Sequence, residues 1–66
     1  MKYEELLNTI EECESNIQYN SGKLREEVFF SDDYDSKSLN EILRRATFIK
    51  MYADILINGL LEHFKQ

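Results

Sequence analysis

The sequence predicts an all-α fold, an antiparallel two-helix hairpin that is completed by a partner or by homodimerisation. Apolar residues recur every three or four positions through two long segments, which is the period of a helix buried along one side. One cluster of turn-forming residues separates these segments, and the chain contains no proline. Two helices of similar length joined by a short turn pack side by side in opposite directions. We expect residues 1–66 to form a single domain.

The first helix is expected over residues 2–30. Its apolar stripe consists of Tyr3, Leu6, Leu7, Ile10, Cys13, Ile17, Leu24 and Val28. The stripe has a gap around Gly22. There the helix either continues, at a cost of about 1 kcal/mol relative to alanine, or breaks and restarts with Ser21 as its N-cap. A continuous helix is favoured because the stripe keeps its phase across the gap.

The turn is expected over residues 31–37, where short polar side chains hydrogen-bond to nearby backbone. Ser38 is expected to be the N-cap of the second helix, with Glu41 completing a capping box. Three aspartates in the turn raise the possibility of a calcium loop. A loop that starts at Asp33 would lack the glycine at its sixth position and the glutamate at its twelfth. We therefore expect a solvated turn.

The second helix is expected over residues 38–65. Its main stripe, which we expect to face the first helix, consists of Leu39, Ile42, Leu43, Ala46, Ile49, Ala53, Leu56, Ile57, Leu60, Leu61 and Phe64. Lys50 falls inside this stripe, so its ammonium must reach out to water. Because the stripe is wide and continuous, it should supply most of the core.

A second set of apolar residues lies roughly opposite that stripe and is expected to face solvent. A single partner helix covers only one side of a helix, and contiguous exposed apolar patches usually mark interaction sites. Aromatic residues and methionine are also enriched in interfaces. Adjacent arginines flank the patch, where they suit an acidic rim on a partner or only keep the helix soluble. The expected partner-binding residues are Arg44, Arg45, Phe48, Met51, Tyr52, Ile55 and Gly59.

The small size of the chain favours a partner. A domain of this length buries only about 60% of the surface that its unfolded chain exposes. Its stability then comes out near zero unless a disulfide, a metal or a partner contributes. With one cysteine and one histidine, the chain can form neither an internal disulfide nor a structural zinc site. We expect no metal and no cofactor, which leaves a partner chain as the common solution.

The sequence contains no enzymatic signature. Cys13 lies on the apolar stripe beside several glutamates, which raise a thiol pKa, so a structural role is favoured over a nucleophilic one. His63 lies near a helix C-terminus, where a cation suits the helix dipole. The chain has no glycine-rich phosphate loop, no nucleophile elbow and no Cys-x-x-Cys motif. We expect a protein that is not an enzyme.

The net charge of −5 and the pI near 4.7 argue against nucleic acid and anionic membrane as partners. The longest uncharged apolar stretch runs from Ile55 to Leu61, far short of the roughly 18–20 residues that span a bilayer. Acidic residues also occupy the N-terminal region, where a signal peptide needs an apolar segment. The expected location is the cytoplasm.

Two segments carry a resemblance to a known family. The opening run from Tyr3 to Glu11 looks like a first helix that starts with a Leu/Glu-rich amphipathic turn, and the run from Glu41 to Lys65 has an apolar Ala-x-Ile-Leu-Ile centre at residues 53–57. In both, the chain resembles the small co-chaperones of type III secretion needle subunits (the YscE/PscE type). The resemblance implies a heterotrimer in which the hairpin stabilises a tetratricopeptide-like (TPR-like) chaperone. The two proteins would keep a needle subunit unpolymerised in the cytoplasm, without catalysis.

Two other interpretations remain open. An acidic helical inhibitor or regulator, of the phage or plasmid type, would bind a host protein through the carboxylates of the first helix. Its binding would weaken steeply with salt, whereas binding through the apolar patch would largely survive salt. A homodimeric four-helix bundle is compatible with either function.

Overall fold

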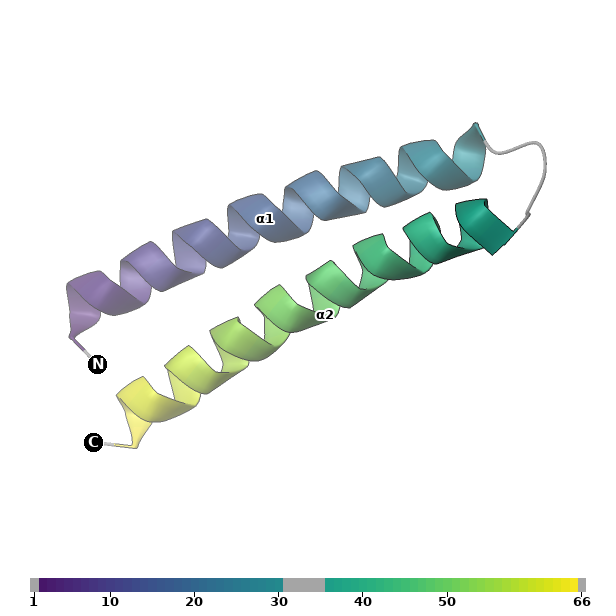
Figure 1. The fold of residues 1–66 in the computed structure, drawn as a ribbon. Coiled ribbons are helices and arrows are strands. Elements are labelled where there is room, and N and C mark those ends of the chain that lie inside the picture. The colour runs from purple at the N-terminus through teal and green to yellow at the C-terminus, as the bar shows by residue number, and fades with distance from the viewer. Residues whose placement is uncertain (1, 31–35, 66) are drawn as a thin grey trace.

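The computed structural model describes residues 2–30 and 36–65, which form two helices, α1 (Tyr3–Phe29) and α2 (Ser36–Phe64). The helices run in opposite directions and lie side by side along their length (Figure 1). The described residues include no strand. The rod that results measures 49 × 16 × 11 Å. The predicted all-α antiparallel hairpin is confirmed.

Helix α1 is continuous through Gly22, as its unbroken apolar phase predicts. An added Cβ at Gly22 would meet nothing within 4 Å, so this residue is a weak point in the helix and not a packing site. The helix begins after Lys2, whose carbonyl accepts a 2.9 Å hydrogen bond from the Leu6 N–H. It ends where the Phe30 N–H donates a 2.9 Å hydrogen bond to the Glu26 carbonyl.

Helix α2 begins at Ser36, two residues before the expected start. Ser38 therefore lies in the first turn of the helix, and its prediction as the N-cap is wrong. The helix already includes Ser36 and Lys37, so Ser38 lies inside it and is half-buried. The aspartates of the expected turn, at 32, 33 and 35, lie outside the described residues.

The contact between the helices follows a seven-residue repeat. Among the buried and half-buried residues, one series in each helix is spaced alternately by four and three positions, which is the spacing of a coiled-coil seam. In α1 the series consists of Leu6, Ile10, Cys13, Ile17, Asn20, Leu24 and Glu27. In α2 it consists of Ser38, Ile42, Arg45, Ile49, Tyr52, Leu56, Gly59 and His63. We refer to these two sets as the hairpin contact.

The hairpin contact is apolar near the chain termini and polar near the turn. Leu6 and Cys13, at 5% and 2% exposure, are the buried apolar side chains among the described residues. Toward the turn the polar residues Asn20, Glu27 and Arg45 share the contact with the half-buried Leu24 and Ile42. Only part of the contact is therefore a hydrophobic core, which agrees with the small core expected of so short a chain.

The position of the core on α2 differs from the sequence-based expectation. Five residues of the main stripe, Leu39, Leu43, Ile57, Leu61 and Phe64, are 48–77% exposed. The contact is rotated instead toward Tyr52 and Gly59. If the leucines faced α1, the polar side chains of Asn20 and Glu27 would be buried against apolar groups, which is costly. The observed rotation places Arg45 opposite them.

Candidate partner-binding faces

Four of the seven expected partner-binding residues lie together on the outside of α2. Arg44, Phe48, Met51 and Ile55 each precede a residue of the hairpin contact by one position, which turns them by about 100° from that contact. Met51 and Ile55 are 42% and 44% exposed, and Phe48 is half-buried. The Arg44 guanidinium carbon lies 5.5 Å from the centroid of the Phe48 ring. We name these four residues the methionine face.

The other three expected residues do not face solvent as predicted. Gly59 is buried, and Tyr52 and Arg45 are half-buried, all three within the hairpin contact. The expectation placed them on the outer side because it took the leucine stripe of α2 as the core. Since the stripe is rotated away from α1, these residues fill the space that it leaves.

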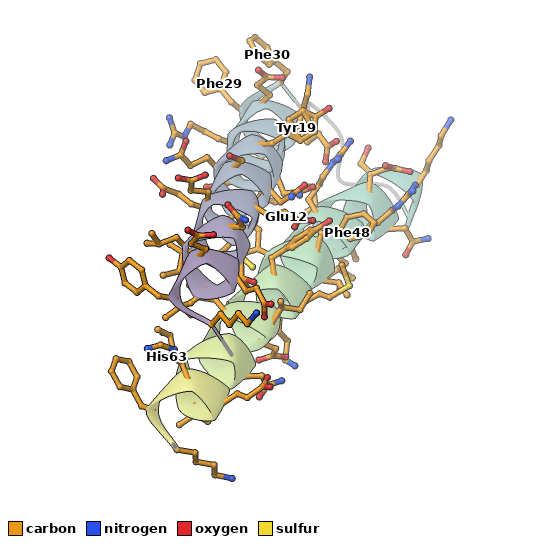
Figure 2. The ribbon with its side chains drawn as sticks, turned by 90° about the vertical axis from the view of Figure 1, so that its left-hand side faces the viewer. Glu12, Tyr19, Phe29, Phe30, Phe48 and His63 are labelled. Carbon is orange, nitrogen blue, oxygen red and sulfur yellow. The ribbon has the colours of Figure 1, made fainter. Side chains whose placement is uncertain are left out.

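Arg45 joins the two helices through polar side chains. Its Nη1 donates a hydrogen bond of 3.2 Å to Oδ1 of Asn20, and its Nε donates to Oε1 of Glu27 at 3.4 Å. The guanidinium carbon also lies 5.9 Å from the centroid of the Tyr19 ring. Figure 2 shows Tyr19 of α1 and Phe48 of α2 on the same side of the hairpin. These contacts assign Arg45 to the fold of the hairpin.

Asn20 and Glu27 complete this polar cluster from α1. The Asn20 amide donates a 2.8 Å hydrogen bond to the Asn16 carbonyl one turn earlier, so both ends of its amide are bonded. Oε2 of Glu27 is buried without a hydrogen-bond partner among the described residues. The cluster therefore depends on Arg45 to offset the carboxylate charge.

A larger apolar surface lies on the other side of α2. We name Leu39, Leu43, Ile57, Leu61 and Phe64 the leucine face; all five are exposed. Four of these residues follow a residue of the hairpin contact by one position, and Leu61 follows by two, so the face is turned away from the methionine face. In an antiparallel pair, the residues one position after the contact lie on the same side of both helices. Leu7 and Val28 of α1, both partly exposed, therefore extend the leucine face.

The leucine face is interrupted by one charged residue. Lys50 lies near the middle of α2, and its ammonium pairs with the carboxylate of Asp54, 3.1 Å away and one turn later. The Lys50 side chain is 79% exposed, so its aliphatic stem stays available to an apolar neighbour while the charge is paired. The sequence pattern identified the apolar residues of this face but assigned them to the core.

Acidic side chains cover much of the outer surface of α1. Glu4, Glu5, Glu11, Glu12 and Glu14 are all exposed. Gln18 donates a 3.2 Å hydrogen bond to the Glu14 carboxylate, and the Lys23 ammonium pairs with Glu26 at 3.6 Å. The N-terminal half of α1 is therefore a strongly negative surface. Glu5 and Glu12, which each precede a residue of the hairpin contact by one position, lie on the same side of the hairpin as the methionine face.

Cys13 and His63, whose side-chain types most often take part in chemistry, lie in different parts of the hairpin. Burial and the neighbouring Glu12 carboxylate raise the pKa of the Cys13 thiol, which keeps it protonated at neutral pH. His63 is half-buried, and its ring lies 5.0 Å from the Phe64 ring near the end of α2. The described residues contain no group of three or more His, Cys, Asp and Glu side chains that could hold a metal ion.

Across the described ranges, neither helix is long and apolar enough to cross a membrane. No protein-family model, curated protein or solved structure matches the chain.

Proposed function

We propose that this chain is a protein-binding subunit that presents the leucine face of α2 to a helical partner. One observation carries the proposal: five large apolar side chains are exposed on one face, while only Leu6 and Cys13 are buried apolar side chains among the described residues. Exposed apolar surface gathered on one face of a helix is a feature of interaction sites. The methionine face offers a second, smaller surface on the opposite flank.

A partner on the leucine face would supply the core that the hairpin lacks. Fully burying one leucine, isoleucine or phenylalanine side chain contributes about 1.5–3 kcal/mol. Because a partner that binds only the folded hairpin also shifts the folding equilibrium by mass action, binding and folding would support each other. The leucine face lies on one continuous helix.

In its specific form, the proposal is that the chain is a co-chaperone. It would stabilise a TPR-like chaperone and help to keep a secretion needle subunit unpolymerised. The resemblance in the first helix and in the C-terminal run supports this form. The shape is also suitable, because a narrow rod 49 Å long fits the extended concave surface of a helical-repeat protein.

The test is capture of binding proteins from the native cell with the tagged full-length chain at about 0.5 M salt, an ionic strength that screens exposed charges. Recovery of a helical-repeat chaperone together with a small needle-type subunit is the expected result. Ile57→Asp should abolish this recovery, and Ile55→Asp, two residues away on the methionine face, is the matched control. If only Ile55→Asp abolishes recovery, the partner binds the methionine face. Failure to recover such a chaperone would overturn the co-chaperone proposal.

A second candidate is favoured by the acidic surface of α1. An inhibitor or regulator that mimics a polyanion would present the exposed glutamates to a basic groove on a host protein. Its partner should be captured at low salt and lost at high salt, and Glu11→Lys with Glu14→Lys should weaken capture further. A partner that is insensitive to these two charge reversals would exclude this candidate.

A further inference from the structure

The isolated chain exposes more surface than a compact protein of its mass does. A compact protein of 7.9 kDa exposes about 4,400 Å². This hairpin exposes 5353 Å², an excess of about 900 Å². A standard protein–protein interface buries about 800 Å² on each partner. The excess is therefore the amount that one such interface would remove.

The residues of α2 that follow the hairpin contact by one position, which include four of the five residues of the leucine face, form a series that can pair with its own reverse. Each follows a residue of the hairpin contact by one position, and in chain order they are Leu39, Leu43, Ala46, Lys50, Ala53, Ile57, Leu60 and Phe64. Large side chains lie at both ends, and reversal about the midpoint between Lys50 and Ala53 sets Ala46 against Ile57 and Lys50 against Ala53. An interface between two identical copies about a twofold axis must be complementary to itself. This series meets that condition when it is reversed.

We propose that, in the absence of another partner, the leucine face of α2 is covered by α2 of a second copy of this chain, antiparallel about a twofold axis between Lys50 and Ala53. The proposal goes beyond the function proposed above, because it concerns what covers the same face before a partner binds. Two hairpins stacked in this way form a four-helix bundle.

The antiparallel arrangement matches side chains in size. It sets Leu39 opposite Phe64 of the second copy and Leu43 opposite Leu60. It also sets Ala46 opposite Ile57, so that a small residue faces a large one and the helices can approach closely. The stem of Lys50 lies against Ala53, while Asp54 holds the Lys50 ammonium at 3.1 Å in the hairpin itself.

The charges of α1 favour the same arrangement. When α2 lies on α2 in a face-to-face pair, α1 also lies antiparallel to α1 of the second copy. This sets Arg25 of one copy nearly level with Glu11 of the other. The other face-to-face twofold arrangement places α2 on α1, where the leucine face would meet Glu11, Glu14 and Gln18. Burying these polar side chains against leucines is costly, so pairing of α2 with α2 is preferred.

Lysine cross-linking distinguishes these arrangements in the unmodified protein. Lys37 and Lys65 of one chain lie at opposite ends of α2, about 42 Å apart at 1.5 Å per residue. An amine-reactive cross-linker with a much shorter spacer cannot join them within one chain. In the antiparallel dimer, Lys37 of one copy lies beside Lys65 of the other. Pairing of α2 with α1 instead brings together the two Lys37 side chains.

The experiment combines sedimentation equilibrium of the full chain with cross-linking of mixed light and heavy isotope-labelled copies. A dimer mass with an intermolecular link between Lys37 and Lys65 is expected. A monomer at all concentrations, a larger assembly, or a dimer with links only between equivalent Lys37 residues would overturn the proposal. A monomer that still captures a chaperone would overturn the dimer and leave the proposed function intact. A dimer that captures no chaperone would support the dimer and overturn the co-chaperone proposal.

Variants test the face independently of the cross-links. Leu43→Asp should give the monomer mass, and Ile55→Asp, on the methionine face, should remain a dimer. Because loss of the dimer can also unfold so small a chain, the helical circular dichroism of both variants is measured at the same concentrations. If Leu43→Asp keeps the dimer mass, the leucine face is not the interface.

Discussion

Arg45 of α2 donates a hydrogen bond from Nη1 to Oδ1 of Asn20 in α1, and the two atoms lie 3.2 Å apart. This contact lies in the polar half of the hairpin, where the other close partner of Arg45 is Glu27. A polar group at a coiled-coil contact position fixes register at a cost in stability. The pair therefore explains which side of α2 faces α1, even though α2 has a more apolar side to offer.

Arg45→Ala should destabilise the hairpin by about 1–3 kcal/mol. The substitution leaves the Glu27 carboxylate half-buried without its cation and removes the partner of the Asn20 amide oxygen. Urea denaturation followed by circular dichroism measures the loss. Arg44→Ala is the matched control, because Arg44 is exposed and contacts only the Phe48 ring among the described interactions, and its effect should stay within about 0.5 kcal/mol.

The contact between Arg45 and Glu27 can be tested for energetic coupling. In a double-mutant cycle, Arg45→Ala combined with Glu27→Gln should cost less than the sum of the single effects, because each single change already removes their interaction. Strict additivity would show that the 3.4 Å contact between Arg45 and Glu27 contributes nothing to stability.

Leu6→Ala should cost about 2–5 kcal/mol, because Leu6 is one of the two buried apolar side chains among the described residues and its loss leaves a cavity. A loss of this size should unfold much of the isolated chain at room temperature. Thermal melts followed by circular dichroism provide the measurement. Leu7→Ala, at the adjacent and 40% exposed position, is the control and should have a much smaller effect. Equal losses at the two positions would mean that the hairpin contact is misplaced by one residue.

The number, type and direction of the helices could be predicted from the sequence because they depend on local rules. Helical periodicity, the absence of proline and one polar turn are sufficient for a hairpin. The apolar stripe of α1 also identified Leu6 and Cys13 as core residues, but Tyr3, Leu7 and Val28 of the same stripe are 40–65% exposed.

The rotation of α2 could not be predicted in the same way. Its apolar residues cover more of its circumference than one helix can bury, so periodicity alone allows several contact lines. The choice depends on long-range pairing of Arg45 with Asn20 and Glu27, which lie 25 and 18 residues away in sequence. Two signals in the sequence point to the observed contact: the strict alternation of four and three positions from Ser38 to His63, and the polar residues at matching positions of α1.

Gly22→Ala should stabilise the hairpin by about 0.5–1 kcal/mol. The backbone there is already helical, an added methyl group would meet nothing within 4 Å, and alanine has the higher helix propensity. A shift of the urea midpoint to higher concentration measures the gain. Gly59→Ala provides the contrast, because Gly59 is buried in the hairpin contact and a methyl group must be accommodated there. A loss of stability at Gly22 would mean that its backbone is strained or covered in solution.

The stability of the hairpin should fall as the pH rises above about 9. Burial and the Glu12 carboxylate raise the pKa of Cys13 in the folded chain above the ordinary thiol value of 9.0. Between these two pKa values the unfolded chain loses the thiol proton while the folded chain keeps it, which favours the unfolded state. The contribution of Cys13 is therefore fully present below pH 9 and is lost as the pH rises through the folded pKa.

Urea denaturation between neutral pH and pH 10.5 measures this loss, and comparison with Cys13→Ala isolates it from the titration of lysines and tyrosines. The variant should be less stable than the native chain at neutral pH, because it leaves a cavity, but its stability should fall less steeply above pH 9. The native thiol should also react slowly with a disulfide reagent at neutral pH and rapidly in urea, since the thiolate is the reactive form and Cys13 is 2% exposed. Parallel pH profiles for the two proteins, together with rapid reaction of the folded thiol, would place Cys13 on the surface and remove it from the hairpin contact.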